Sequence, residues 1–193
     1  MNIIQKTKQY TTIPPLLLFS ISLFLLCNSF MAEALPYAIG DTGPGQGIVF
    51  FISADGEHGL EAAPSNQGTG IKWSNQYDTV INAVRNGVNA GLYNTERIII
   101  NQGAGSYAAQ LCANYRGGGY GDWYLPSKRE LNLLYKQKAV VGGIAVVGDY
   151  SVTAYWSSTE GGSRDAWYQF FNDGHQYNFS KISTLSVRAI RAF

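Results

Sequence analysis

The fold of this chain is decided around residues 122–131, which read Asp122-Trp123-Tyr124-Leu125-Pro126-Ser127-Lys128-Arg129-Glu130-Leu131. Pro126 disfavours helical backbone in the residue before it, so the chain reaches this point in an extended conformation. Ser127 and Glu130 have the spacing of a capping box, in which each side chain accepts a hydrogen bond from the other residue's backbone N–H. Apolar side chains then recur at helical spacing, at positions 131, 134 and 135. The stretch predicts an extended segment that turns directly into a helix.

The residues before this segment predict two extended stretches and two helices. Residues 47–52 are a β-branched and aromatic run that ends at Ala54-Asp55-Gly56, which is typical of a strand followed by a turn. Residues 60–64 form a second extended segment, whose proline indicates an edge or a strand end. We expect Asn94 or Thr95 to cap a helix through residue 100, and Ser106 to cap a helix through residue 115.

The residues after the segment predict strands. Residues 154–159 are short and rich in strand-forming side chains. Residues 166–171 and 176–179 flank Asn172-Asp173-Gly174, which is typical of a hairpin turn. Residues 186–193 close the chain as a last strand. The whole pattern predicts an α+β domain with small antiparallel sheets and two or three flanking helices.

The first 34 residues have the three parts of a secretory signal peptide: Lys6 and Lys8, an apolar centre, and small residues at Ala32 and Ala34. The apolar centre spans about 12 residues, which is shorter than the roughly 20 that cross a bilayer as a helix. We therefore predict cleavage after Ala34, a single domain over residues 35–193, and no membrane span once the signal is removed. An uncleaved anchor and lipidation at Cys27 are the alternatives. The predicted location is secreted, at the cell surface or in the periplasm.

The charge balance of residues 35–193 limits which classes of partner the domain is expected to bind. Basic and acidic side chains are equal in number there. Nucleic-acid-binding domains usually carry a basic excess, so we predict no nucleic-acid partner. A strongly polyanionic partner would require a local basic patch.

The sequence assembles no catalytic set and no metal site. Cys112 is the one cysteine after cleavage, so no internal disulfide is expected, and its helical surroundings predict a buried thiol. His58 and His175 lie far from Cys112 in sequence, and the three residues lack the spacing of zinc ligands. Asp122 and Asp173 stand beside glycines, as turn residues do, and calcium needs a denser cluster of oxygens.

The glycine-rich run Gly43-Pro44-Gly45-Gln46-Gly47 precedes a predicted strand. Phosphate-binding loops place their glycines between a strand and a helix, so this run predicts a tight turn at the entry to the sheet. We predict no cofactor, no metal and no catalytic residue for this chain, and hence no enzyme.

Aromatic side chains crowd the second half of the sequence and supply the candidate site. Strand alternation puts Trp167 and Gln169 on one face and Tyr168 and Phe170 on the other. One face must fill the core, and rings left outside would suit sugar binding, because aromatic faces stack on pyranose rings while amides and arginines bond hydroxyls or sulfates. The alternative is that all the rings only pack. The predicted contact region is Trp156, Arg164, Trp167, Gln169, His175 and Lys181.

Five ordered segments carry a family resemblance. They are residues 37–50, beginning Tyr37-Ala38-Ile39-Gly40-Asp41; Gly59-Leu60-Glu61-Ala62-Ala63-Pro64; residues 122–131; Tyr155-Trp156-Ser157-Ser158-Thr159-Glu160; and residues 187–193. Together they resemble the C-terminal domain of the Legionella collagen-like adhesin. The resemblance implies a C-type-lectin-like fold whose two ends pair, and it implies a homotrimer that binds sulfated glycosaminoglycans. A more distant similarity is to the formylglycine-generating, sulfatase-modifying fold.

Three features of the chain depart from those relatives. No Gly-X-Y stalk precedes the domain, its net charge is near zero, and the Glu-Pro-Asn and Trp-Asn-Asp calcium motifs of C-type lectins are missing. The leading hypothesis is a non-enzymatic carbohydrate-binding or adhesion module whose partner is a polysaccharide or glycoconjugate. The alternatives are an enzyme on a sulfatase-modifying-like scaffold, which a single mature cysteine disfavours, and a structural envelope protein that binds other proteins.

Overall fold

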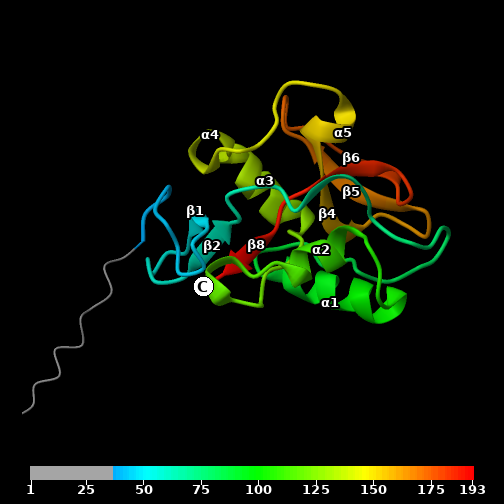
Figure 1. The fold of residues 1–193 in the computed structure, drawn as a ribbon, viewed down its shortest axis with the longest axis horizontal. Helices are drawn as coiled ribbons and strands as arrows, with labels where there is room; N and C mark the ends of the chain where they lie inside the picture. Colours follow the sequence, from blue (N-terminus) through cyan, green and yellow to red (C-terminus); the bar gives the residue numbers. More distant parts are fainter. Residues whose placement is uncertain (1–36) are drawn as a thin grey trace, which may run out of the picture. The chain divides into compact units, whose positions relative to one another are not determined.

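The computed structural model describes residues 37–193, so the predicted signal peptide lies outside the described residues. The helices are α1 (Ala90–Gln102), α2 (Ala108–Asn114), α3 (Lys128–Lys136), α4 (Lys138–Val141) and α5 (Tyr150–Thr153), with a 3-10 turn at Gly117–Gly119. The strands are β1 (Ile48–Ile52), β2 (Gly59–Ala62), β3 (Gly68–Lys72), β4 (Ala154–Glu160), β5 (Asp165–Phe170), β6 (Gln176–Ser180), β7 (Thr184–Val187) and β8 (Ile190–Ala192). The predicted α+β class is confirmed (Figure 1).

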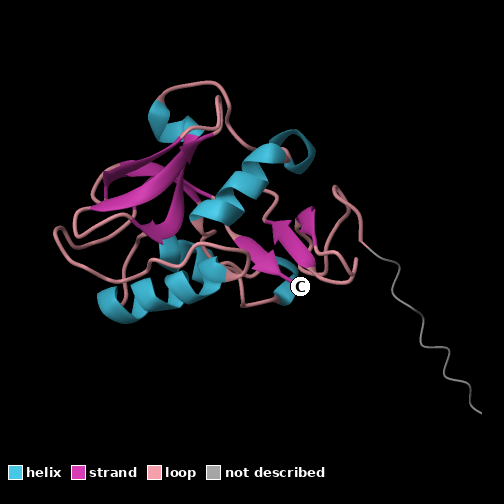
Figure 2. Cartoon of the chain, turned by 180° about the vertical axis from the view of Figure 1, so that it is seen from behind, coloured by secondary structure: helices cyan, strands magenta, loops and turns pink. Residues whose placement is uncertain are grey.

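Two sheets organise these elements. The smaller has the order β1-β2-β8, so strands from the two ends of the described chain meet on either side of β2. The larger has the order β3-β7-β4-β5-β6, with β4 and β7 parallel and the other pairs antiparallel. Helix α3 lies between the two sheets and α1 covers part of the larger one (Figure 2). The predicted hairpin is confirmed: β5 and β6 pair in regular register about the turn at residues 171–175.

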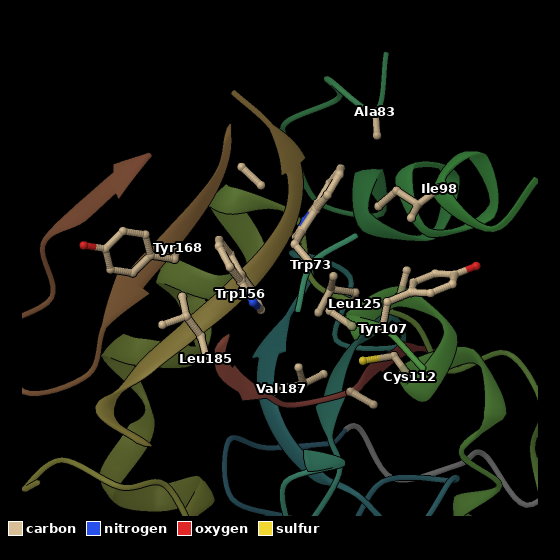
Figure 3. Packing of buried hydrophobic residues seen from close by; sticks show 14 of the residues in the cluster. Trp73, Ala83, Ile98, Tyr107, Cys112, Leu125, Trp156, Tyr168, Leu185 and Val187 are labelled. Atoms are coloured by element: carbon tan, nitrogen blue, oxygen red, sulfur yellow. The ribbon is translucent and has the colours of Figure 1, made fainter. Parts of the chain in front are cut away.

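The core has two parts, one on each side of β4. Trp73, Trp156 and Tyr168 pack with residues of α1 and α2 on one side, while Tyr155 and Phe171 pack with α3 on the other. Figure 3 shows Trp73 and Trp156 between Ile98 of α1 and Tyr168 of β5. Every residue of β4 is buried, because β4 is the central strand of its sheet and both of its faces are covered. Burial on both faces removes the polar alternation that marks a half-exposed strand.

The capping box at α3 is confirmed. Ser127 Oγ accepts a hydrogen bond from the Glu130 N–H at 3.2 Å, and the Glu130 carboxylate accepts one from the Ser127 N–H at 2.7 Å. Both side chains are buried. The cap therefore fixes where α3 begins and turns the acidic group of its first turn inward, away from solvent.

Helices α1 and α2 begin at other residues than predicted. Helix α1 begins at Ala90, with Asn94 and Thr95 buried inside it rather than at its cap. Its first N–H groups have a distant partner, because Glu130 accepts hydrogen bonds from Asn89 N–H at 2.7 Å and Gly91 N–H at 3.1 Å. Helix α2 begins at Ala108 with Tyr107 at the cap position, one residue after the predicted Ser106. A cap supplied from 41 residues away leaves no local sequence signal.

The other two buried glutamates fix loops in the same way. Glu61 accepts hydrogen bonds from the N–H groups of Gly45 and Gly47 at 2.9 Å each, and from Arg191 Nη1 at 2.9 Å. A Cβ on Gly45 would lie 2.7 Å from the Glu61 carboxylate, so the predicted turn must be glycine-rich at that point. Glu160 binds the N–H groups of Ile81 and Asn82 at 2.8 and 2.7 Å. Buried carboxylates thus supply partners for backbone groups that the sheets leave unpaired.

Candidate functional site

Three of the six predicted contact residues lie inside the domain. Trp156, Gln169 and Lys181 are fully buried. Trp156 Nε1 donates to the Ile71 carbonyl at 2.8 Å. Lys181 Nζ donates to Glu160 Oε1 at 2.6 Å and to the carbonyls of Thr79 and Ser163. These groups have internal partners, so Trp156 and Lys181 hold the fold together and do not reach a ligand at the surface.

The other three predicted residues occupy separate places. Arg164 precedes β5 and pairs with Asp78 at 2.8 Å, which lowers the pKa of the Asp78 carboxyl. His175 is exposed at the opposite end of the β5–β6 hairpin, 3.2 Å from Asp173. Trp167 is half-buried in the middle of β5. The predicted region therefore does not converge as one cluster, and the half-buried Trp167 lies on β5 between the exposed Arg164 and His175.

Trp167 lies against the beginning of α3. The Lys128 ammonium stands 3.0 Å from the centre of a Trp167 ring, within cation–π range. Desolvation lowers the pKa of Lys128. Lys128 is the first residue of α3, and its position follows from the capping box immediately before it. The Lys128 ammonium is thereby held over the indole ring of Trp167, and both side chains are partly exposed.

A ladder of amides runs behind this pair and joins the hairpin to α3. Gln169 Nε2 donates to Asn132 Oδ1 and to the Gly174 carbonyl, both at 2.9 Å. Gln176 Nε2 donates to the Lys128 carbonyl at 2.8 Å and to Gln169 Oε1 at 3.1 Å. The buried Gln169 is therefore fully bonded, and it fixes the register between β5, β6 and α3. We call the surface formed by Lys128, Asn132, Tyr135, Trp167 and Gln176, with the buried Gln169 beneath it, the α3–hairpin seam.

The seam borders a local basic patch. Four basic side chains stand within residues 128–138, and they are Lys128, Arg129, Lys136 and Lys138. The one acidic residue in that range is Glu130, which is buried and bonded to backbone N–H groups. Lys138 Nζ stands 4.1 Å from the Tyr135 ring centre and donates to the Phe171 carbonyl. A near-neutral domain thus presents positive charge where α3 begins and ends.

The capping box was the signal that could have located this patch. It predicts that Glu130 faces its own backbone, so the exposed charges of the first turn of α3 are those of Lys128 and Arg129. Sequence reasoning identified the box but assigned the contact region to the aromatic strands. Lys128, Arg129 and Asn132 were therefore not among the predicted contact residues, although Lys128 lies over Trp167 and Asn132 bonds Gln169.

The described residues contain candidate nucleophiles without the geometry to use them. Cys112 is buried, and burial raises the pKa of its thiol. The β1–β2 turn brings Ser53, Asp55 and His58 together, with His58 Nδ1 2.9 Å from Asp55 Oδ2. The Ser53 hydroxyl, however, has the Asp55 carboxylate and the His58 carbonyl as its acceptors, so the His58 imidazole is not placed to take its proton.

Within residues 37–193, no three His, Cys, Asp or Glu side chains gather as a metal site would require. Across the same residues, no helix has the length and apolarity needed to cross a bilayer. The seam brings a basic group, an aromatic ring and an amide together, in Lys128, Trp167 and Gln176.

The family model of the Lcl C-terminal domain matches residues 64–191, which is more than half of the chain. The match includes α1, α2, α3 and every strand of the larger sheet, and hence the whole seam. A comparison with curated protein sequences gave no match.

Proposed function

We propose, because the chain belongs to the Lcl C-terminal domain family of an adhesin, that it is a non-enzymatic module that binds carbohydrate through the α3–hairpin seam. The expected partner is a polysaccharide or glycoconjugate of the glycosaminoglycan type, met outside the cytoplasm after export. The observation that carries the proposal is the Lys128 ammonium held over the half-buried Trp167 ring where α3 begins.

The chemistry of the seam suits a sugar that carries sulfate or carboxylate groups. Lysine and arginine form charge-assisted hydrogen bonds with such anions, and these bonds are about twice as strong as neutral ones. The Lys128 ammonium now stands over the Trp167 ring. A sulfate that binds this ammonium would draw it from the ring and open the indole face to the adjoining pyranose. One ligand would then use both groups in turn.

The neutral total charge is compatible with this mode of binding. Within residues 35–193, nine basic and nine acidic side chains remain outside the interior once the buried Glu61, Glu130, Glu160, Lys181, Arg188 and Arg191 are set aside. Long-range attraction is therefore weak, and binding depends on a few local contacts. Such contacts are screened by salt over about 8 Å at physiological ionic strength. We expect moderate retention on heparin that is lost as salt rises.

The test is retention of the purified protein on immobilised heparin, with a double variant in the patch. Lys128→Ala with Arg129→Ala removes two charges from the seam, and we expect elution at clearly lower salt. Lys72→Ala with Arg85→Ala removes the same charge from other exposed sites and serves as the matched control. Equal elution of the two double variants would contradict the seam as the binding site. A wild-type protein that is not retained even at low salt would contradict glycosaminoglycan binding itself.

A further inference from the structure

Asn86 and Gly87 form a dipeptide in the exposed loop before α1. Asn86 is the one asparagine of the sequence that precedes a glycine, and it is exposed. Neither the Gly87 N–H nor the Asn86 Nδ2 amino group makes a hydrogen bond to any of residues 37–193. A glycine has no side chain to shield its backbone nitrogen. The Gly87 nitrogen is therefore free to attack the amide carbon of the Asn86 side chain.

The beginning of α3 holds the oxygen of the same amide. Asn86 Oδ1 accepts a hydrogen bond from the Arg129 N–H at 2.8 Å. Arg129 is the second residue of α3, where backbone N–H groups have no partner within the helix and the helix dipole favours negative charge. Attack on the amide carbon places negative charge on Oδ1. A donor already aimed at that atom stabilises the charge as it develops.

We propose that Asn86 is a site of spontaneous deamidation, with the Arg129 N–H stabilising the oxyanion of the first step. The Gly87 nitrogen bonds to Asn86 Cγ and loses its proton to water. The Cγ–Nδ2 bond breaks, and ammonia leaves with a proton taken from water, so that a five-membered succinimide remains. Water then opens this ring at one of its two carbonyls, which gives an aspartate or an isoaspartate. The steps together consume one water, release one ammonium ion and leave one new negative charge.

The two products differ in their effect on the fold. An aspartate keeps the hydrogen bond from the Arg129 N–H and gains from the helix dipole. An isoaspartate adds a carbon atom to the backbone between Arg85 and Gly87. The carbonyls of both residues are fixed, by Asn94 Nδ2 at 2.8 Å and by Ser127 Oγ at 2.7 Å. We therefore expect the isoaspartate form alone to unfold more easily than the original protein.

Either product places a negative charge where α3 begins. Lys128 and Arg129 are the first two residues of that helix and carry the exposed positive charges of its first turn. The consequence for binding rests on the proposed function: a carboxylate beside these two side chains offsets part of their charge, so an anionic sugar is attracted less. Retention on heparin should therefore fall as the protein ages.

The first test is incubation of the purified protein in mildly alkaline buffer, followed by mass spectrometry of its peptides. We expect Asn86 to convert before the exposed Asn172, and faster as the pH rises, because the attacking nitrogen must lose its proton. Gly87→Ala is the matched variant: a Cβ at Gly87 would meet no atom within 4 Å, so the fold is kept while the attack is hindered. Conversion of Asn86 no faster than that of Asn172, or unchanged by Gly87→Ala, would overturn the proposal. In urea, where α3 is unfolded, conversion should slow, and a rate as high as in the folded protein would remove the Arg129 N–H from the reaction.

The second test measures the consequence for binding on immobilised heparin. Asn86→Asp reproduces the aspartate product and should elute at lower salt than the wild type. Asn114→Asp adds the same charge at an exposed residue of α2, whose Oδ1 also accepts a hydrogen bond, from Gln110 Nε2 at 2.9 Å, and it serves as the matched control. Equal elution of the two variants would overturn the effect of deamidation on the seam. A wild type that heparin does not retain contradicts the proposed function instead, and the peptide masses then decide the deamidation by themselves.

Discussion

The two faces of the β5–β6 hairpin carry residues that alternate along the same two strands, yet one face packs aromatic rings and the other forms hydrogen bonds to α3. On one face Tyr168, Phe170 and Phe179 pack ring against ring, with centroids 5.2 to 5.6 Å apart between Tyr168 and the other two. On the other face Gln169 and Gln176 bond amides to α3. The aromatic face adds to the core that α1 and α2 share with the larger sheet. The polar face holds the hairpin against α3. The difference shows that the aromatic side chains of the hairpin serve packing, whereas its amides bond the hairpin to α3 beneath the proposed site.

The largest effect is expected from the aromatic face. Tyr168→Ala removes a ring that contacts Trp156, Phe170 and Phe179 and is 9% exposed. Truncations of this kind cost about 3–5 kcal/mol in well-packed cores, and partial exposure places this one near the lower end. Urea unfolding should show the loss as a lower midpoint with an unchanged slope. A loss below about 1 kcal/mol would mean that this face is not part of the core.

A smaller effect is expected from the polar face. Gln169→Leu keeps the size of the side chain but leaves Asn132 Oδ1 and the Gly174 carbonyl without their donor. Unpaired buried groups cost about 1–3 kcal/mol. Because Gln169 also bonds Gln176, which holds the Lys128 carbonyl, heparin retention should fall in the same variant. If the variant loses stability but is still fully retained on heparin, the amide ladder would contribute to folding and not to binding.

Local patterns predicted most of the elements, because their causes are local. The capping box of Ser127 and Glu130, and the Asn172-Asp173-Gly174 turn, each contain the partners that they use. The start of α1 could not be predicted, since its N–H groups are bonded by Glu130 from far along the chain. The same holds for Lys181, whose charge suggests a surface position until its partner Glu160 is known.

The candidate site was half predictable for a related reason. Strand alternation correctly put Trp167 and Gln169 on one face, because alternation is a property of any strand. Alternation does not say which strand is central. Trp156 lies on β4, which is covered on both faces, so its ring fills the core although its residue type suits a sugar. The order of strands in a sheet arises from long-range pairing that one sequence does not display.

Trp167→Ala tests the exposed side of the hairpin, where we expect a larger effect on binding than on stability. Trp167 is half-buried, so its removal should lower the unfolding free energy by less than the loss of Tyr168, on the order of 1 kcal/mol. Its effect on binding should be larger, because the indole is the ring of the seam. Isothermal titration with a heparin oligosaccharide and urea unfolding measure the two effects on the same sample. A variant with weakened folding but undiminished binding would remove the ring from the site.

The smallest effect is expected at the tip of the hairpin, where the two faces meet. Hydrogen bonds from the His175 backbone N–H and from its ring hold the pKa of the Asp173 carboxyl below its usual range. A lowered folded-state pKa contributes stability above the unfolded value of about 3.9, and that contribution is lost as pH falls through the folded-state pKa. Asp173 is exposed, so solvent screens the interaction and the contribution is small. Asp173→Asn should therefore melt slightly below the wild type at pH 6, and the difference should vanish in acid. A difference that grows as the pH falls would show that Asp173 acts through something other than its charge.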